Sequence, residues 1–388
     1  MIRLGDVMTL KRGYDLAHRE RNPGEVPVIS SSGMTGYHDV ARVNAPGVVT
    51  GRYGTLGKVH FSDIPFWPLN TSLYVVDFKG NDPRYCAALL EASSLANRSG
   101  AAAVPGLNRN DLHEILVPVT SLVTQRQIAA LLGAYNDLIK SNGRRIEILE
   151  EAIHLEFRAR FDEGEGEDEG DVLADLTRRV SLTDLVRLNP RNTMPAGSVR
   201  YLPMDSLSTS DMSLGPFEIR DQPTGVRFQN GDTLMARITP SLQNGKTGYV
   251  SGLEKDEVAC GSTEFLVMRG ISVSPEYTYC LARTQHVRSV AIASMSGATG
   301  RQRVSTACFD ELKVLAPLPE ADARFSQAVR PSFNMIFSLA AMNVNLTVQR
   351  QLILPKLISG DFDLSNLDID MARISEQETL WCKVEAIS

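Results

Sequence analysis

The sequence predicts an α+β protein with two pseudo-symmetric globular domains and two long helices that form an antiparallel coiled coil. Three observations support this fold class. A run from Ser99 to Pro118 returns as Ser296 to Pro317, which indicates an internal repeat. Within each copy, short apolar strands alternate with Gly-, Ser- and Asn-rich turns. Each copy also ends in a long segment with heptad spacing.

The same order of elements recurs in both halves. A Gly/Arg/Lys turn segment (Gly51 to Val59; Ala236 to Val250) precedes an apolar strand (70–76; 262–268). A Pro-Xaa-Tyr helix start follows in each half. The copies are offset by about 180–200 residues, whereas solenoid repeats are about 20–50 residues long. We therefore expect two complete domain-plus-helix units.

The predicted boundaries follow from shifts in composition and periodicity along the chain. A globular domain, a spacer helix and an acidic linker come first, and a second domain and helix with a C-terminal segment follow. The six segments are 1–123 (domain), 124–161 (helix), 162–180 (linker), 181–322 (domain), 323–361 (helix) and 362–388 (C-terminal segment).

The first long helix has apolar residues at alternating spacings of four and three up to Ile153, followed by a step of four to Phe157, and Asn142 is the one polar residue in this seam. A period of 3.5 residues over more than four heptads is typical of a coiled coil, and the helix would be roughly 50 Å long. The apolar residues of this seam are Ile128, Leu132, Tyr135, Ile139, Ile146, Leu149, Ile153 and Phe157.

Shifting this seam by 201 residues gives the corresponding seam of the second helix. Asn343 then takes the place of Asn142, while Thr347 and Arg350 interrupt the apolar pattern. A buried seam asparagine fixes register at some cost in stability. The pattern predicts that the two helices pack against each other antiparallel, with the two asparagines setting the register. The alternative is two independent amphipathic helices, one on each domain.

The composition is that of an ordinary globular protein, with 43% hydrophobic and 22% charged residues in 388. No apolar run approaches the ~20 residues that cross a bilayer, and the first residues lack the apolar core of a signal peptide. The five cysteines form no CxxC pair. This argues against a disulfide framework or a zinc site, and it favours a cytoplasmic location.

The net charge of −6 is concentrated in one segment. Residues 1–120 contain 12 Lys and Arg against 11 Asp and Glu, and residues 181–320 contain 14 against 14. Eight acidic residues and no basic one lie between Asp162 and Asp175. The near-neutral domains do not exclude DNA binding, but they suggest that partners share the phosphate contacts. The linker composition favours a tether over a mimic of DNA.

No pattern of catalytic residues emerges, and no metal site is expected. The sequence has no G-x-G-x-x-G, P-loop or G-x-S-x-G motif and no metal-ligand spacing. The run from Asp82 to Tyr85 is similar to the D-P-P-Y motif of adenine methyltransferases. Its counterpart, Ser274 to Tyr277, shares only a capping residue and a following proline, so a helix cap is the favoured interpretation.

A second near-match to a catalytic motif is Glu311-Leu312-Lys313, which is similar to the E-x-K of metal-dependent nucleases. Its counterpart in the first half is Asp111-Leu112-His113, which has no lysine. Both segments precede an apolar strand that ends in proline. We interpret them as a domain-closing element.

Polar loops that carry Arg or Lys occur at matching places in both halves. Arg and Lys read guanine, Asn and Gln read adenine, and Ser and Thr read several bases. Other side chains of these loops would contact phosphates and position the protein. Single loops of this kind are usually solvated turns, but matched sets favour DNA contact. The candidates are Arg52, Tyr53, Thr55, Lys58, Asn70, Ser72, Asn108 and Arg109, and in the second half Arg237, Thr239, Asn244, Lys246, Ser262, Thr263, Arg301 and Arg303.

Four segments make the chain resemble the specificity subunit of type I restriction–modification systems. They are Pro27 to Asp39, Gly51 to Val59, Asn70 to Tyr74 and Gln125 to Ala129. The resemblance is looser in the second half, where Arg324 to Gln327 replaces the Gln-Arg-Gln-Ile opening of the first helix.

The resemblance implies two target recognition domains held apart by an antiparallel helix pair. Each domain would read one half of a split site in double-stranded DNA. It also implies a subunit without catalysis or cofactor of its own. Its partners would be modification subunits, two of them, that use S-adenosylmethionine, and restriction subunits that use ATP.

Two other classes of function stay open from the residues alone. One is a scaffolding protein with two partner-binding domains and no DNA role. The other is a self-contained methyltransferase or nuclease with degenerate motifs. Binding of S-adenosylmethionine to the isolated chain would favour the enzyme, and salt-sensitive DNA binding would argue against the scaffold.

Overall fold

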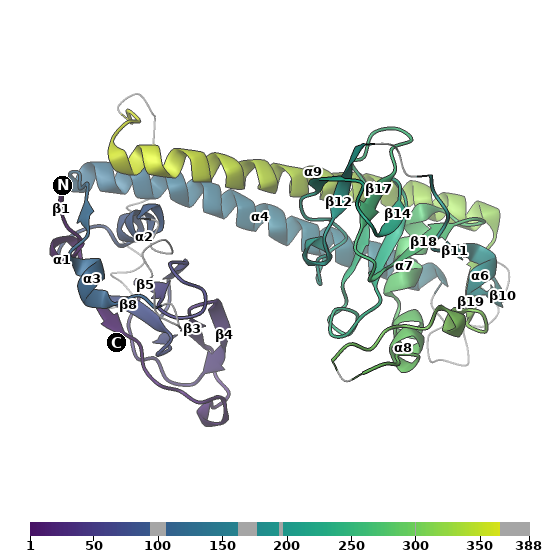
Figure 1. Cartoon of the computed structure of the whole chain (residues 1–388), viewed down its shortest axis with the longest axis horizontal. Helices are drawn as coiled ribbons and strands as arrows, with labels where there is room; N and C mark the ends of the chain where they lie inside the picture. Colours follow the sequence, from purple (N-terminus) through teal and green to yellow (C-terminus); the bar gives the residue numbers. More distant parts are fainter. Residues whose placement is uncertain (94–105, 162–176, 194–196, 299, 365–388) are drawn as a thin grey trace. The chain divides into compact units, whose positions relative to one another are not determined.

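The computed structural model describes residues 1–93, 106–161, 177–193, 197–298 and 300–364. It divides into two compact units (Figure 1). Unit 1 comprises Met1–Ile139 and Asn345–Ser388, and unit 2 comprises Lys140–Val344. Outside the described residues lie most of the acidic linker, most of the C-terminal segment and the first part of the repeated run that begins at Ser99.

Unit 1 is built on a four-stranded sheet of order β2-β8-β5-β6 and a three-stranded sheet of order β4-β3-β7. A short antiparallel pair, β1 with β9, closes the domain. The strands are β1 (Ile2–Arg3), β2 (Thr9–Arg12), β3 (Val26–Ser30), β4 (Gly33–His38), β5 (Gly47–Gly51), β6 (Val59–Ser62), β7 (Trp67–Pro68), β8 (Ser72–Asp77) and β9 (Leu116–Val117). The helices are α1 (Leu4–Val7), η1 (His18–Glu20), α2 (Pro83–Ala92) and α3 (Arg109–His113).

Unit 2 repeats this plan with sheets of order β11-β18-β15-β16 and β13-β12-β17-β14, and with the pair β10 and β19. The strands are β10 (Thr177–Ser181), β11 (Val186–Leu188), β12 (Ser198–Leu202), β13 (Glu218–Asp221), β14 (Val226–Phe228), β15 (Thr233–Ala236), β16 (Thr247–Tyr249), β17 (Ala259–Gly261), β18 (Phe265–Gly270) and β19 (Lys313–Pro317). The helices are α6 (Leu182–Leu185), η3 (Met204–Ser206), α7 (Pro275–Arg283), α8 (Gln285–Ala293) and η4 (Thr306–Phe309).

The two units share the same order of main elements, with β14 and α8 as additions in unit 2 among the described residues, and this confirms the predicted α+β fold. The helix after the central sheet begins in the same way in both. Asp82 accepts a hydrogen bond from the Tyr85 N–H (2.8 Å), and Ser274 accepts one from the Tyr277 N–H (3.2 Å). A proline occupies the first turn of α2 and of α7. The near-match to a methyltransferase motif is therefore a helix cap in both copies.

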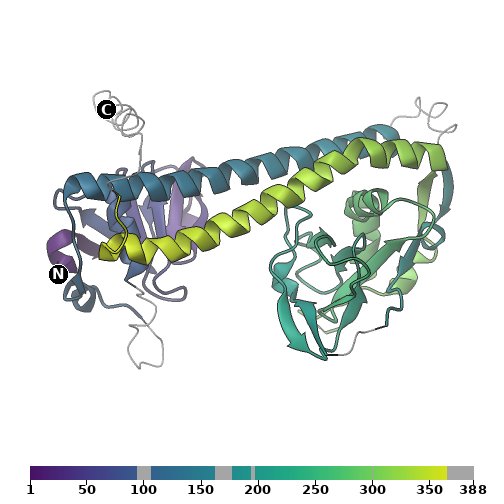
Figure 2. The same cartoon turned by 90° about the horizontal axis from the view of Figure 1, so that it is seen from above.

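The long helices are α4 (Leu122–Phe161) and α9 (Pro319–Ser359), and they pack side by side within each unit (Figure 2). In unit 1, Leu132 near the start of α4 shares a core with Leu354 near the end of α9. In unit 2, Ile153 near the end of α4 shares a core with Phe333 near the start of α9. The early part of each helix thus meets the late part of the other, so the pairing is antiparallel as predicted.

The seam contains the polar residues that the sequence singled out. Asn142 is buried, and its Nδ2 donates to Oδ1 of Asn343 at 2.9 Å in unit 2. Thr347 is exposed, while Arg350 in unit 1 leaves the seam to form an ion pair with Glu91 of α2. Across the described residues, no helix is long and apolar enough to cross a membrane.

Candidate nucleic-acid interface

Three of the predicted loops of unit 1 join at one place. The Arg52 N–H donates to the Thr71 carbonyl (3.0 Å), and the Arg52 carbonyl accepts from the Leu107 N–H (3.0 Å). Tyr53 and Gly106 form an isolated antiparallel bridge beside these bonds. The backbone therefore brings together the loop after β5, the loop before β8 and the loop before α3.

The corresponding loops of unit 2 join through the same bonds. The Arg237 N–H donates to the Glu264 carbonyl (2.9 Å), and the Arg237 carbonyl accepts from the Val304 N–H (2.9 Å). Ile238 and Arg303 form the matching antiparallel bridge. The two units thus build one loop scaffold twice.

This scaffold defines which residues correspond between the units. Arg52 corresponds to Arg237, Thr71 to Glu264, and Gly106 to Arg303. The sequence analysis grouped Arg301 and Arg303 with Asn108 and Arg109 as candidate contacts, and the backbone bonds place Gly106 at the position of Arg303. At this junction two uncharged residues of unit 1, Thr71 and Gly106, correspond to two charged residues of unit 2, Glu264 and Arg303.

The predicted contact residues differ in how far their side chains reach solvent. Buried side chains cannot contact a duplex, and half-buried ones contact it only in part. The exposed residues are Tyr53, Thr55, Lys58, Asn108, Arg109, Asn244, Thr263, Arg301 and Arg303; the half-buried residues are Arg52, Asn70, Arg237, Thr239, Lys246 and Ser262; and Ser72 is buried.

Several of the predicted residues are already engaged in holding the loops. The Ser72 hydroxyl donates to the Leu69 carbonyl (2.7 Å). Lys246 is only 17% exposed, and its Nζ donates to the Met204 carbonyl (3.1 Å). The Asn108 side chain caps α3 by accepting from the Asn110 N–H (3.0 Å). These three residues shape the loops from within.

Other predicted residues bind neighbouring loops through their side chains. Nη2 of Arg237 donates to the Val304 carbonyl (3.3 Å), and the Thr239 hydroxyl donates to the Gln302 carbonyl (3.5 Å). The Ser262 hydroxyl accepts from the Glu264 N–H (3.2 Å). Asn70 donates from Nδ2 to the Asp15 carboxylate. These bonds orient the loops.

A cation and an aromatic ring lie together on the exposed side of the unit 1 scaffold. The guanidinium of Arg52 lies 4.6 Å from the centre of the Tyr53 ring, and Tyr53 is 38% exposed. Nearby, Nζ of Lys58 reaches the Ser32 carbonyl at 3.5 Å. A stacked arginine and an exposed lysine present positive charge to a nucleic-acid backbone or base edge.

The sequence analysis missed one residue at the loop junction of unit 2. Glu264 forms a forked ion pair with Arg303, with Nε of Arg303 at 2.9 and 2.8 Å from the two carboxylate oxygens. The hydrogen bonds from Arg303 lower the pKa of Glu264 below its ordinary value. The signal in the sequence was weak, because Glu264 lies at the position of Thr71 and no acidic residue was sought there.

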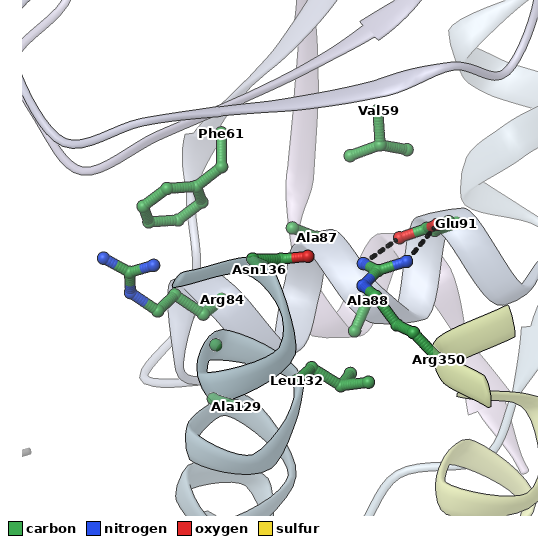
Figure 3. A pocket seen from close by; sticks show the side chains of 11 residues that line it. Val59, Phe61, Arg84, Ala87, Ala88, Glu91, Ala129, Leu132, Asn136 and Arg350 are labelled. Atoms are coloured by element: carbon green, nitrogen blue, oxygen red, sulfur yellow. Dashed lines mark hydrogen bonds and ion pairs between the residues drawn. The ribbon is translucent and has the colours of Figure 1, made fainter. Parts of the chain in front are cut away.

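A pocket in unit 1 lies away from the predicted contacts. It has a volume of about 330 Å³ and lies between α2, β6 and α4 (Figure 3). Arg350 and Glu91 form their ion pair at its wall, and Arg84 stacks on Phe61 at 4.5 Å. None of the predicted DNA contacts lines it. Within the described ranges, no group of three or more His, Cys, Asp or Glu could hold a metal ion.

Residues 1–151 match the family model described as the type I restriction modification DNA specificity domain. The first 151 of the 388 residues are thus similar to the specificity domain of type I restriction–modification systems. Among the chain's curated relatives are two specificity subunits of Escherichia coli, those of the type I restriction enzymes EcoAI and EcoEI. The first is 26% identical over 211 residues, which are 50% of this chain and 35% of that protein. The second is 28% identical over 153 residues, or 37% and 26% of the two chains.

The specificity fold extends over both units. The crystal structure of the type I restriction–modification S subunit from M. genitalium matches 94% of this chain and 96% of its own length, with a TM-score of 0.57. Sequence identity to it is 14%, so this likeness concerns the fold alone. The matches to the two curated subunits span only about a third of their length or less.

Proposed function

We propose that this chain is the DNA-recognition subunit of a type I restriction–modification complex, in which each unit reads one half of a bipartite site in double-stranded DNA. The observation that carries the proposal is the twofold loop scaffold, built by the same backbone bonds around Arg52 and around Arg237. An identical scaffold with different side chains is what two readers of two different half-sites need.

The exposed residues on each scaffold supply the chemistry for reading DNA. Lys58 and Arg109 in unit 1, and Arg301 and Asn244 in unit 2, are exposed and carry donors that suit base edges or phosphates. The paired helices would set the gap between the half-sites. The seam hydrogen bond between Asn142 and Asn343 supports a fixed register for such a spacer.

We further propose that the chain itself carries out no catalysis. The segment that is similar to D-P-P-Y is a helix cap, since Asp82 accepts from the Tyr85 N–H, and its counterpart Ser274 caps α7 in the same way. Adenine methylation with S-adenosylmethionine would belong to two modification subunits. Cleavage coupled to ATP would belong to restriction subunits.

An exposed apolar face on the helix pair in unit 2 supports a docking site for a modification subunit. Ile148 and Leu155 of α4 lie seven residues apart and are exposed, as are Met335 and Met342 of α9. A spacing of seven residues places each pair on one face of its helix. Contiguous exposed apolar side chains mark interaction sites, and we propose these four residues as such a site.

The docking proposal predicts a selective loss of assembly. Leu155→Glu should prevent co-purification with the modification subunit, because it places a charge on the apolar face. Unfolding of the variant alone should match the wild type. The matched control is Glu151→Gln, at an exposed polar position one helical turn before Leu155. Unimpaired assembly of Leu155→Glu would show that the subunit docks elsewhere.

The experiment that tests the function is a map of methylated adenines. The chain is co-expressed with the modification subunit encoded with it, and the host genome is sequenced for methylation. A motif in two parts with a constant gap is the expected result. An undivided motif, or no new methylation despite a stable complex, would contradict the proposal.

A further inference from the structure

The ion pair between Glu264 and Arg303 leaves one edge of the guanidinium unoccupied by Glu264. Nε of Arg303 bonds both carboxylate oxygens, and Nη2 bonds Oε1 at 2.5 Å. An arginine carries five N–H donors in a planar fork. The carboxylate thus takes the side edge, and the end edge, formed by the two terminal nitrogens, keeps donors for another acceptor pair. The Arg303 side chain is 50% exposed.

Both residues are fixed through their backbones at the loop junction. The Glu264 carbonyl accepts from the Arg237 N–H. Arg303 and Ser296 exchange two backbone hydrogen bonds, at 2.9 and 3.1 Å. Glu264 itself is 21% exposed on its side chain, so the carboxylate is a mostly covered support for the more exposed guanidinium. An arginine held in this way loses less conformational entropy when it binds.

We propose that Glu264 positions Arg303 to read a guanine in the half-site of unit 2. The end edge of a guanidinium matches O6 and N7 of guanine in the major groove, which is the most common specific contact of arginine. Glu264 would hold the plane of the fork and act as a positioning residue. This inference rests on the proposed function.

The same position in unit 1 has no such pair among its described residues. Thr71 stands where Glu264 stands, and Gly106 stands where Arg303 stands. Neither residue carries a charge. We therefore expect this guanine contact in one half-site only, and unit 1 must read its half through other side chains.

The test compares Arg303→Lys and Glu264→Gln with wild type in complex with the modification subunit. Arg303→Lys keeps the charge but removes the fork, so preference for one guanine in one half should fall roughly 5- to 150-fold. Glu264→Gln should weaken the preference at the same base to a smaller extent. The matched control is Glu218→Gln, which alters the exposed pair with Arg220 on β13 and should leave the motif unchanged.

A second measurement separates a base contact from a structural effect. A duplex with 7-deazaguanine at the identified base lacks the N7 acceptor. The wild-type complex should lose affinity for this duplex, while Arg303→Ala, which has no side-chain donor, should bind the normal and modified duplexes equally. The inference is overturned if Arg303→Lys retains the wild-type motif, or if it weakens all positions equally, as a phosphate contact would. The proposed function fails separately, in the wild type, if no two-part motif is methylated.

Discussion

Unit 1 and unit 2 share their strands and loop scaffold but are fastened to the long helices by different side chains. In unit 2, Phe157 of α4, Tyr277 of α7 and Phe325 of α9 form an aromatic cluster with ring centres 5.1 to 5.8 Å from Phe157. In unit 1, aliphatic side chains such as Leu132 and Leu354 form the core, and a solvent-open pocket of about 330 Å³ lies beside Leu132.

The polar contacts that fasten each unit to the long helices also differ, because they are more buried in unit 2 than in unit 1. Glu150 of α4 is buried in unit 2 and accepts from the Tyr279 hydroxyl and from the Met212 N–H (3.3 Å). Burial holds the pKa of Tyr279 well above its ordinary value. The ion pair of unit 1 between Glu91 and Arg350 is more exposed. The comparison shows that backbone bonds preserve the repeat while side-chain packing diverges between the units, which is compatible with the proposed reading of two different half-sites.

The largest effect is expected when both helices are lengthened while both domains are left intact. Inserting seven residues after Lys140 in α4 and seven after Val344 in α9 adds about 10 Å to the helix pair, or about three base pairs of DNA. Methylation mapping should find both half-sites unchanged and the gap longer by about that amount. Methylation at the original gap would contradict the role of the helices as a spacer.

Truncating a core side chain of α4 should lower the free energy of unfolding more in unit 2 than in unit 1. Phe157→Ala should lower the free energy of unfolding by about 3–5 kcal/mol, because Phe157 is buried among three rings. Leu132→Ala in unit 1 should cost about 2–3 kcal/mol, at the low end for a buried leucine, because Leu132 already borders a pocket. Denaturant unfolding measures both. An equal or reversed order of the two stability losses would show that the pocket beside Leu132 does not weaken unit 1.

A smaller effect is expected when an ion-paired glutamate is neutralised, either Glu91 of α2 or Glu276 of α7. Glu276 is buried and accepts from the Ser326 hydroxyl and from Nε of Arg330, both at 3.0 Å. Glu276→Gln should cost about 1–3 kcal/mol, since a buried charged hydrogen bond is weakened. Glu91→Gln should cost roughly 0–1 kcal/mol because Glu91 is more than a third exposed. A larger loss for Glu91→Gln than for Glu276→Gln would refute this ranking.

The sequence predicted the fold class well because periodicity and repetition are properties of the backbone pattern. Heptad spacing predicted α4 and α9, and the shared Asn142 and Asn343 predicted a contact that the structure contains. The shift of 201 residues aligns the seams of the two helices but not their first turns. Oε1 of Gln125 accepts from the Asp82 N–H (3.0 Å), and Oδ2 of Asp322 accepts from the Ser274 N–H (2.7 Å). Asp322 is therefore the counterpart of Gln125, 197 residues later. An amide and a carboxylate serve as the same acceptor, so residue identity concealed the correspondence.

The sequence could predict which loops carry the candidate contacts, but not which side chains of those loops reach solvent. Residue type does not reveal that Ser72 and Lys246 are turned into the protein by bonds to backbone carbonyls. Glu264 was missed because its role depends on Arg303, which is distant in the sequence and is brought close by the loop junction. Which side chains face a partner is decided by these tertiary contacts.

The most direct test of the central claim is a methylation map for a variant altered in one unit only. Thr55→Ala with Lys58→Ala removes two exposed side chains of unit 1 and leaves the backbone junction around Arg52 intact. The account predicts weaker or relaxed recognition in one half of the motif, with the other half and the gap unchanged. Equal changes in both halves, in a complex that assembles normally, would contradict the reading of one half-site by each unit.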